Sequence, residues 1–508
     1  MFLPLAFCGF YVGGAGAQMF NNATEVVLMR HGTTTVLSME NNYQGPPEGF
    51  AMVVPVPVVV REGQVKTLPR EVFDKVDVLG APRLVEYWEQ DPCRIPEPPE
   101  EMMVKEESED AAGRDDDADE KKAEPYHVKI EAKFSVGEYD VVVLSAEQST
   151  GLERWLTDNH YAIPKDVEPL LRPYVEQGTK FFVAKVDPKR VTFKDGMATL
   201  SPLRFYYDSP ELTLPIRLGL AASPGTQDLI VNILAPNNTR YEVSNHPNIT
   251  IPTNLVVNDG VRGRFGEFYA ALFDHAIAQV PNAVVTEYAW DSGSCDPCPG
   301  PTLDGDDLAT LGADVLDKTY ANLNSSGFTL TRLHARYGKD IKDDLVFRAV
   351  APIVGGRGIP DATGRMPMDV TPDSSNNFQG RYVIEHPWTG EVACASPQRG
   401  IWGGPTPAIA QQMAQLGTPV SGAPVAATNT AFAPRGQVQL ASLLSSSVPQ
   451  VALLDSHAQS LPIPVRQPQG CGGCETDGTD AGAGASGAAV LLAALTLVRR
   501  RRAGSAQS

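Results

Sequence analysis

Short runs of β-branched and aromatic residues, separated by Gly, Pro and Asn, dominate the chain from Thr24 to His386. Such runs predict strands, because residues branched at Cβ fit a pleated sheet while Gly, Pro and Asn favour turns. The clearest pair is Thr24–Arg30 and Thr33–Glu40, which flank a predicted hairpin turn at His31-Gly32. We therefore expect an α+β fold, mainly antiparallel β-sheet with packed helices, plus a single C-terminal transmembrane or sorting segment.

The same reasoning places further elements along the chain. Strands are predicted at Phe50–Val60, His127–Phe134, Tyr139–Leu144, Thr179–Val186, Ala283–Trp290, Phe328–Tyr337, Leu345–Val354 and Tyr382–His386, with several more between Ala198 and Val243 that are broken at turns such as Pro236-Asn-Asn238. Because Pro55 and Pro57 cannot donate hydrogen bonds, we expect the first of these strands at an edge or a bulge. Apolar residues at helical spacing predict helices at Arg70–Leu79, Pro82–Gln90, Thr150–Asn159, Val167–Gln177 and Phe265–Val280.

Two segments have compositions that do not suit a packed core. Residues 94–124 carry 13 Asp or Glu against 5 Lys or Arg, so we expect an acidic disordered loop that interrupts an exported domain at 18–395. Residues 396–470 are rich in Pro, Ala, Ser, Gln and Gly and have few charges, which predicts an extended stalk.

The C-terminal residues 471–508 combine a cysteine motif, an apolar run at 481–498 and a cluster of basic residues, namely Cys471, Cys474, Arg499, Arg500, Arg501 and Arg502. Arginines resist translocation, so this order predicts a membrane segment whose C-terminus is cytoplasmic. At about 1.5 Å per residue the run spans roughly 27 Å, at the short limit for a bilayer. A removable sorting signal and a soluble Ala-rich tail remain alternatives.

This tail resembles the C-terminal sorting domains of myxobacterial surface proteins. The resemblance implies that Cys471 and Cys474 belong to a sorting or processing motif, with a membrane and a processing protease as partners. The two cysteines are also compatible with a local disulfide or half of a metal site. We expect the protein in the cell envelope or at the cell surface, either anchored by one C-terminal pass or sorted and cleaved.

The N-terminal residues 1–17 fit export only in part. They are apolar and offer a small-residue cleavage site at Ala15–Ala17, but no Lys or Arg precedes the apolar stretch. We interpret them as a partial signal peptide or as the result of a start codon assigned too far downstream.

Export bears on the cysteines, because disulfides persist outside the cytoplasm. Apart from Cys8 and the tail, Cys93, Cys295, Cys298 and Cys394 form an even set that allows three pairings. Cys295-Asp-Pro-Cys298 is compatible with a redox pair or half of a zinc site, but the prolines that follow indicate a loop, which favours a structural disulfide.

Charge and missing motifs narrow the possible functions. A net charge of −19 argues against a nucleic-acid partner, which requires a basic surface. The chain has no His-Glu-x-x-His, no Gly-x-Ser-x-Gly, no phosphate loop and no dinucleotide fingerprint, so we predict no catalytic residue, no metal and no cofactor. Gly355–Gly358 is either an anion cradle or, as we favour, a flexible turn. We place His275 on a helix surface or packing face and His334 on the solvent side of a strand.

Several motifs of the ordered chain resemble a bacterial family catalogued only as domain of unknown function 2330: Asn42–Phe50, Val53–Val58, Leu79–Trp88 and Thr331–Tyr337. The resemblance runs from about Cys8 to Cys394. It implies an exported protein with a cysteine near its mature N-terminus, matched here by Cys8, and it supplies no activity.

These observations favour a non-enzymatic envelope protein that binds or scaffolds something at the surface. The alternative is an envelope thiol oxidoreductase or hydrolase that uses Cys295 and Cys298, with His275 and His334 clustered nearby.

Overall fold

The computed structural model describes residues 10–12, 20–21, 24–40, 43–44, 51–93, 128–159, 161, 167–187, 189–194, 197–222, 226–316, 327–361, 365–405, 411, 424–428, 436, 438–445 and 448–454. All of them belong to one compact unit, Met1–Val465. The predictions for Cys8, the acidic segment 94–124 and the whole tail 471–508 lie outside the described residues. No helix within the described ranges is long and apolar enough to cross a bilayer.

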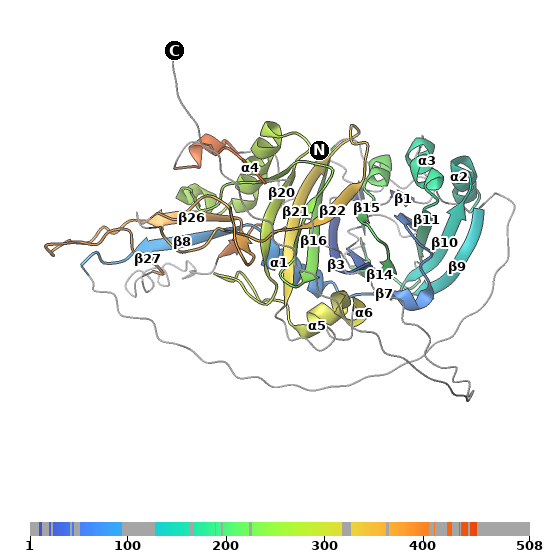
Figure 1. Ribbon diagram of the computed structural model, residues 1–508, viewed down its shortest axis with the longest axis horizontal. Helices are drawn as coiled ribbons and strands as arrows, with labels where there is room; N and C mark the ends of the chain where they lie inside the picture. Colours follow the sequence, from blue (N-terminus) through green and yellow to red (C-terminus); the bar gives the residue numbers. More distant parts are fainter. Residues whose placement is uncertain are drawn as a thin grey trace, which may run out of the picture. The chain divides into compact units, whose positions relative to one another are not determined.

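A large sheet forms the centre of the fold, with strand order β24-β23-β25-β20-β21-β16-β3-β4-β14-β7 (Figure 1). Its longest ladder pairs β16 with β21 in antiparallel register over their full lengths, and β3 lies parallel to β16. The strands of this sheet are β3 (Thr24–His31), β4 (Thr34–Met39), β7 (Val65–Thr67), β14 (Leu203–Asp208), β16 (Gln227–Pro236), β18 (Asn248–Thr250), β20 (Val284–Asp291), β21 (Phe328–Tyr337), β23 (Ile353–Gly355), β24 (Thr371–Pro372), β25 (Asn377–Gln379) and β29 (Ala452–Leu453).

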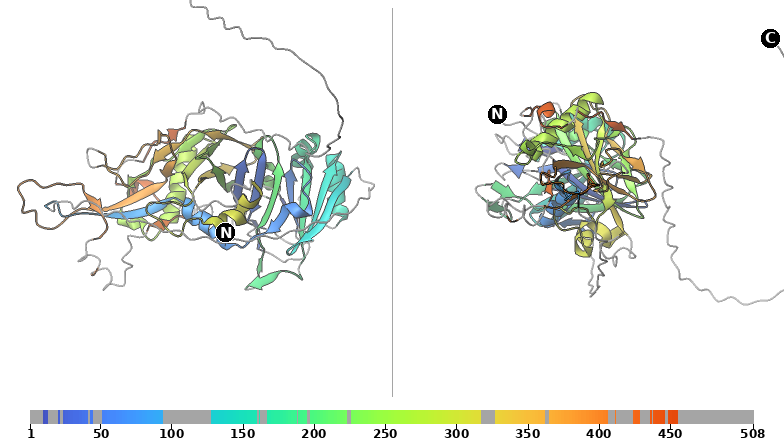
Figure 2. Two further views of the ribbon diagram at one scale, coloured as in Figure 1. Left: turned by 60° about the horizontal axis from the view of Figure 1, so that its bottom comes forward. Right: turned by 90° about the vertical axis from the view of Figure 1, so that its left-hand side faces the viewer.

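A second, five-stranded sheet packs against the β4–β14 end of the large sheet (Figure 2). It consists of β1 (Phe10–Val12), β6 (Ala51–Val56), β11 (Lys180–Val186), β10 (Tyr139–Ala146) and β9 (Val128–Val136). Successive residues of β11 serve its two faces. Phe182 stacks on Phe205 of β14, while Phe181 packs beneath helices α2 (Ser149–Asp158) and α3 (Glu168–Glu176).

A third sheet is built around β8 (Arg83–Glu89), with β26 (Arg381–His386) beside it in parallel register. Its other strands are β19 (Leu255–Val256), β27 (Trp402–Gly403) and β28 (Val425–Ala426). Smaller sheets pair β15 (Leu212–Leu214), β22 (Leu345–Val350) and β17 (Arg240–Val243), then β12 (Thr192–Lys194) with β13 (Met197–Thr199), and β2 (Phe20–Asn21) with β5 (Tyr43–Gln44).

Helices α1 (Glu71–Gly80) and α4 (Phe265–Gln279) lie on the same face of the large sheet. α1 packs near Leu330 of β21, and α4 places Phe273 on His334 of the same strand, four residues further along. The shorter helical segments are α5 (Gly305–Leu308), α6 (Asp314–Leu316), the 3-10 segments η1 (Glu62–Gln64), η2 (Arg217–Ala222), η3 (Asp259–Val261) and η6 (Leu440–Ser442), and the π-helical η4 (Ala309–Ala313). The described chain is therefore mostly β-sheet with few helices, in agreement with the predicted α+β class.

Most predicted elements are confirmed. The predicted hairpin forms between β3 and β4, but its turn is Gly32-Thr33, one residue later than predicted, because His31 pairs with Thr34. Gly32 has a φ of 56°, and four of the five predicted helices are present. The exception is Pro82–Gln90, which is strand β8 and not a helix. β8 is an interior strand with buried side chains on both faces, so its apolar residues do not alternate with polar ones. Their spacing therefore matched that of a helix. Trp88 stacks on His386 of β26 at 4.5 Å between ring centroids.

Two further predictions need adjustment. β6 is not an edge strand over Ala51–Val53, where β1 pairs with it, although Pro55 lies beyond the end of β1. The strand predicted at Leu345–Val354 is two strands, β22 and β23, interrupted at Pro352.

The described parts of 396–470 are not a stalk. β28 pairs with β8 and β29 with β18, and the side chains of Ala427, Val438 and Leu443 are buried beside α4. The segment is poor in apolar residues, but those it has cover the outer side of this helix, which composition alone does not reveal.

The structure pairs the four core cysteines as Cys93–Cys394 and Cys295–Cys298. The first bridge joins the segments that follow the parallel strands β8 and β26 and closes a sequence separation of 301 residues, against 3 for the second. The predicted disulfides are confirmed, and the pairing is now assigned.

Because a disulfide restricts the unfolded chain more when its loop is longer, the two bridges should differ in effect. Replacing Cys93 and Cys394 by Ser should lower the free energy of unfolding by up to about 5 kcal/mol, and replacing Cys295 and Cys298 by about 2 kcal/mol. Guanidinium unfolding of the two double variants measures this difference.

Alkylation under denaturing conditions without reductant should leave all four cysteines unmodified. Equal losses of stability in the two double variants, or free thiols at Cys295 and Cys298, would contradict the assignment.

Candidate functional site

The Cys295–Cys298 loop lies in the connection between β20 and β21. Side chains from other strands hold it by donating hydrogen bonds to its backbone carbonyls. Arg83 Nη1 donates to the carbonyl of Pro297 at 3.0 Å, and Gln379 Nε2 donates to that of Asp296. The guanidinium of Arg83 also donates to the carbonyl of Leu79 in the last turn of α1, where a cation is favourable. Cys298 is exposed and Cys295 is half-buried against the α1 core.

Gly355–Gly358 forms a packed turn. Gly356, at φ 69°, accepts a hydrogen bond from Gln379 Nε2 through its carbonyl. A Cβ on Gly358 would lie 3.0 Å from Arg381 Nη1, so this position leaves no room for a side chain without movement. The anion-cradle alternative therefore gains no support from the described contacts.

His334 is not on the solvent side of its strand, as its sequence context predicted, but is 1% exposed and lies under α4. Its ring stacks on Phe273 at 3.7 Å, its Nδ1 lies 2.8 Å from Glu287 Oε1, and its Nε2 lies 3.3 Å from Asp228 Oδ1. These partners do not include His275, which is half-buried on α4. Among the described residues no group of three His, Cys, Asp or Glu could hold a metal ion.

Glu287 is the centre of this buried network. Its carboxylate accepts hydrogen bonds from Tyr269 at 2.7 Å and from Arg332 Nε at 2.8 Å, besides its contact with His334. Arg332 continues to Asp77 of α1 at 2.7 Å. Burial by itself would raise the pKa of Glu287, but the imidazole of His334 and the charge of Arg332 lower it from 4.5 to about 2.

Alternation along β21 explains why these charges meet. Arg332, His334 and Arg336 lie two residues apart and so share one face of the strand, toward α1 and α4. Arg336 pairs with Asp228 on β16 and with Asp274 on α4. The cluster thus fastens both helices to the sheet. Its enclosure beneath them suits a structural role rather than contact with a ligand.

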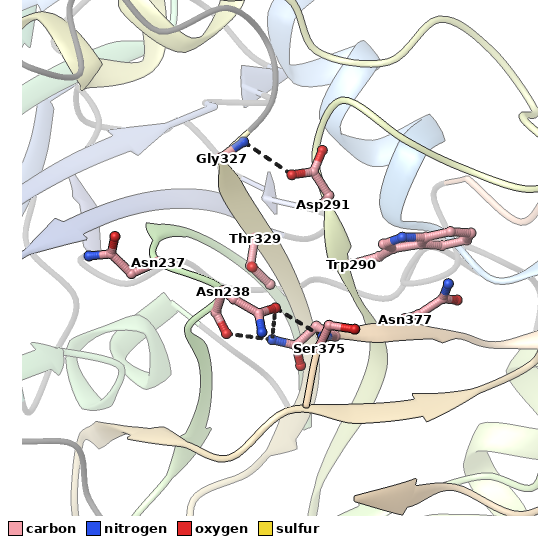
Figure 3. Close-up of a pocket in the computed structure, with 9 residues that line it drawn as sticks. Asn237, Asn238, Trp290, Asp291, Gly327, Thr329, Ser375 and Asn377 are labelled. Atoms are coloured by element: carbon pink, nitrogen blue, oxygen red, sulfur yellow. Dashed lines mark hydrogen bonds between the residues drawn. The ribbon is translucent and has the colours of Figure 1, made fainter. Parts of the chain in front are cut away.

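An open cleft of about 640 Å³ lies at the ends of the strands β16, β20, β21 and β25 (Figure 3). Its lining contains four amides, two hydroxyls, one indole, one glycine and a single ionisable group, contributed by Asn237, Asn238, Trp290, Asp291, Gly327, Thr329, Ser375, Asn376 and Asn377. A volume of this size is typical of small-molecule sites.

One wall of the cleft is a tight turn whose sequence determines its shape. Asn237 and Asn238 have φ of 60° and 55°, and the amide of Thr239 donates to the carbonyl of Pro236. Positive φ at both central positions defines a type I′ turn, for which Asn is well suited. Asn376 then locks this turn, since its side chain donates to the carbonyl of Asn238 at 2.7 Å.

The opposite wall comes from β20. Both oxygens of Asp291 are occupied by backbone donors, Gly293 at 2.9 Å and Gly327 at 3.1 Å, so this carboxylate holds together the two ends of the long β20–β21 connection. Trp290, its neighbour, is half-buried and lies opposite Asn377 on β25 (Figure 3).

Several polar groups of the cleft retain hydrogen-bonding capacity. Within the described chain the side chains of Asn237 and Ser375 and the indole N–H of Trp290 have no hydrogen-bond partner, and Asn377 Oδ1 is buried without one. Sequence reasoning identified Pro236-Asn-Asn238 only as a turn and Trp290 only as the end of a strand. The sequence does not reveal that β25, which is distant along the chain, pairs with β20 and completes the cleft.

A family model described as "Uncharacterized protein conserved in bacteria (DUF2330)" matches residues 4–348. The match ends before Cys394, where the motifs alone placed the end of the resemblance. No curated protein and no solved structure matches the chain.

The Glu287 network makes a prediction about acid stability. Since the folded state lowers the pKa of Glu287 from 4.5 to about 2, its stabilisation is complete above pH 4.5 and is lost as the pH falls toward 2, by roughly 3 kcal/mol at most. Glu287→Gln should cost about 3 to 5 kcal/mol at pH 7, because it breaks a buried ion pair. Urea unfolding from pH 7 to pH 2.5 tests both points.

Glu267→Gln is the matched control, because Glu267 also belongs to the α4 region but pairs with Arg264 at the surface. It should change the free energy of unfolding by less than about 1 kcal/mol. If wild-type stability does not fall between pH 4.5 and pH 2.5, the role assigned to Glu287 is wrong, whether or not the Gln variant folds.

Proposed function

The chain belongs to the uncharacterised bacterial family DUF2330, and we propose that it is a non-enzymatic binding protein of the cell envelope that holds a neutral saccharide in the cleft beside Trp290. The observation that carries this proposal is the chemistry of the lining. Amides and hydroxyls match the alternating donors and acceptors of sugar hydroxyl groups, and one half-buried indole offers an apolar face with a polar N–H.

The charge of the cleft supports an uncharged ligand. Asp291 is the one ionisable residue among the nine that line it, and backbone amides already occupy both of its oxygens. These residues therefore offer no cation to an anionic ligand, and to a cationic one only a carboxylate that already accepts two backbone hydrogen bonds, so desolvating a charged ligand there is costly. Neutral polyhydroxylated molecules avoid this cost.

The same lining favours binding over hydrolysis. Glycoside hydrolases commonly use two carboxyl groups about 5 to 9.5 Å apart, one of them as an acid. The nine residues provide one carboxylate, that of Asp291, which accepts hydrogen bonds from the backbone at both ends of the β20–β21 connection. We therefore propose recognition without turnover.

A thiol oxidoreductase or hydrolase that uses Cys295 and Cys298 remains the rival proposal. The exposure of Cys298 favours it, since an attacking thiol must reach a Cys sulfur of this bridge. The anchoring of the loop by Arg83 and Gln379 favours a fixed structural bridge instead. Free thiols at Cys295 and Cys298 in the alkylation experiment would favour this rival.

We further propose that the tail 471–508 anchors or sorts the protein, on the basis of its order of cysteines, apolar run and arginines. Intact-mass analysis of protein recovered from the native envelope should give a chain that ends near Cys471–Cys474. A mass that retains Arg499–Arg502 would instead identify a permanent anchor, and recovery of the full-length chain from the soluble fraction alone would contradict both roles.

Saccharide binding is tested with Trp290→Ala. Isothermal titration with neutral trisaccharides, triacetylchitotriose and maltotriose, should detect binding to the wild type that weakens more than about tenfold in the variant, because an aromatic anchor is lost. Binding should change little between 20 and 300 mM salt, since an uncharged ligand is not screened.

Trp402→Ala provides a matched control, because Trp402 is also half-buried but lies on β27, outside the cleft lining. It should bind the sugars as the wild type does. If no neutral glycan on a broad array binds the wild type, or if both Trp variants lose binding equally, the cleft is not the proposed saccharide site.

A further inference from the structure

A second cavity, of about 490 Å³, lies at the seam between the five-stranded sheet and the large sheet. The elements that line it come together from across the sequence: the end of β6, the segment between α3 and β11, and residues of α3, β4, β14, β15 and β22. Figure 1 shows α3, β14, β15 and β22 in this part of the molecule. We call it the seam cavity. It shares no residue with the cleft beside Trp290.

Three carboxylates line the seam cavity, but one of them is already neutralised. Asp344 accepts hydrogen bonds from the hydroxyl of Tyr174 at 2.7 Å and from Arg217 Nη2 at 2.8 Å. The backbone amides of Ile216 and Arg217 donate to the same carboxylate. The Arg217 guanidinium also lies over the Tyr174 ring, at 4.7 Å from its centroid. The only lining cation is thus committed to Asp344.

Glu211 and Asp343 remain without a counter-charge. Both side chains are exposed, and within the described residues neither forms an ion pair or hydrogen bond. Burial lowers the pKa of His246 despite the opposing charge of Asp343, so this nearby imidazole is neutral at pH 7 and does not offset the acid. With three carboxylates and one arginine, the lining carries a net charge of −2.

The rest of the lining mixes apolar, aromatic and neutral polar side chains; the polar ones are Gln177, Thr179, Ser209, Thr213 and Asn245. Leu37, Pro55 and Val346 contribute hydrocarbon surface, and Tyr174 and Tyr207 contribute ring carbons. Arg30 lies behind Ser209 and donates to its carbonyl, but the charge of Asp208 acts on this guanidinium, so the pair adds no net charge. A pocket that combines hydrocarbon surface, neutral polar groups and two unpaired acids is complementary to a flexible aliphatic ligand that carries positive charge.

We propose that the seam cavity binds an organic cation of the alkylammonium class, with its hydrocarbon part among Leu37, Pro55 and Tyr207 and its charged end between Glu211 and Asp343. This proposal is independent of saccharide binding, because it rests on different residues. Such a ligand would contact both sheets at once and would stabilise their packing, since binding to the folded state raises its free energy of unfolding.

Isothermal titration of the full chain with spermidine tests the assignment. We expect a single site whose dissociation constant rises at least about tenfold in the double variant Glu211→Gln with Asp343→Asn, because two attractive charges are removed. Affinity should also fall steeply between 20 and 300 mM salt, as it does for exposed charges. A thermal melt with and without spermidine should show a higher midpoint in its presence for the wild type only.

The control removes the same number of charges from another surface. Glu153→Gln with Asp158→Asn, on α2, should change the affinity by less than about twofold, because these residues do not line the cavity.

The tripeptide Gly-Lys-Gly serves as a second probe. If it displaces spermidine, the natural ligand group is a basic side chain; if it does not, the natural ligand is a free polyamine. No binding of either probe to the wild type, or equal weakening in both double variants, would overturn the proposal.

Discussion

The fold depends on one buried carboxylate. Glu287, on β20, is fully enclosed and accepts hydrogen bonds from α4 through Tyr269 and from β21 through Arg332, which in turn reaches Asp77 on α1. Two helices are therefore attached to the same sheet face by directional contacts as well as by apolar packing. Ion pairs of this kind add little net stability, because desolvation offsets their attraction, but an incomplete set is costly. The loss of any one member of the network should therefore be costly, although the complete set adds little net stability.

The long β20–β21 connection shows how the same sheet supports a functional surface. Asp291 joins the two ends of this connection at the cleft, while Arg83 and Gln379 hold the Cys295–Cys298 loop in its interior. Gln379 belongs to β25, the strand that also contributes Asn377 to the cleft. The disulfide loop thus positions the outer strand of the cleft, and this gives it a physical role that does not require thiol chemistry.

Local sequence patterns predicted most strands and helices correctly, but they did not predict which segments pack against one another. The β-branched and apolar run of Thr24–His31 and the apolar stripe of Phe265–Gln279 each arise within one element, so both were predictable. Pro82–Gln90 was predicted wrongly because pairing with β26, some 300 residues away in sequence, decides that it is a strand. His334 was placed in solvent for a similar reason: Phe273 and Glu287, which enclose it, come from elsewhere in the chain. Along Thr331–Tyr337, charged and apolar residues visibly alternate, but nothing in this segment indicates that two helices cover its charged face. The cleft beside Trp290 is formed by four separate segments, 237–238, 290–291, 327–329 and 375–377, and had no local signature.

The small sheet β15-β22-β17 is the physical connection between the two cavities. β15 and β22 contribute Thr213 and Val346 to the seam cavity, and β17 begins just after the Asn237-Asn238 turn of the cleft. Arg240 on β17 donates to the carbonyl of Ala351 and pairs with Glu242 at 2.6 Å, with both side chains buried. Glu242 also lies 3.8 Å from Arg348 of β22. Moving β17 relative to β22 would break this contact and the hydrogen bond to Ala351, and would leave buried polar groups without partners. Energetic coupling between the two cavities would therefore require a second arrangement of β17, in which its contacts with Ala351 and Arg348 are broken.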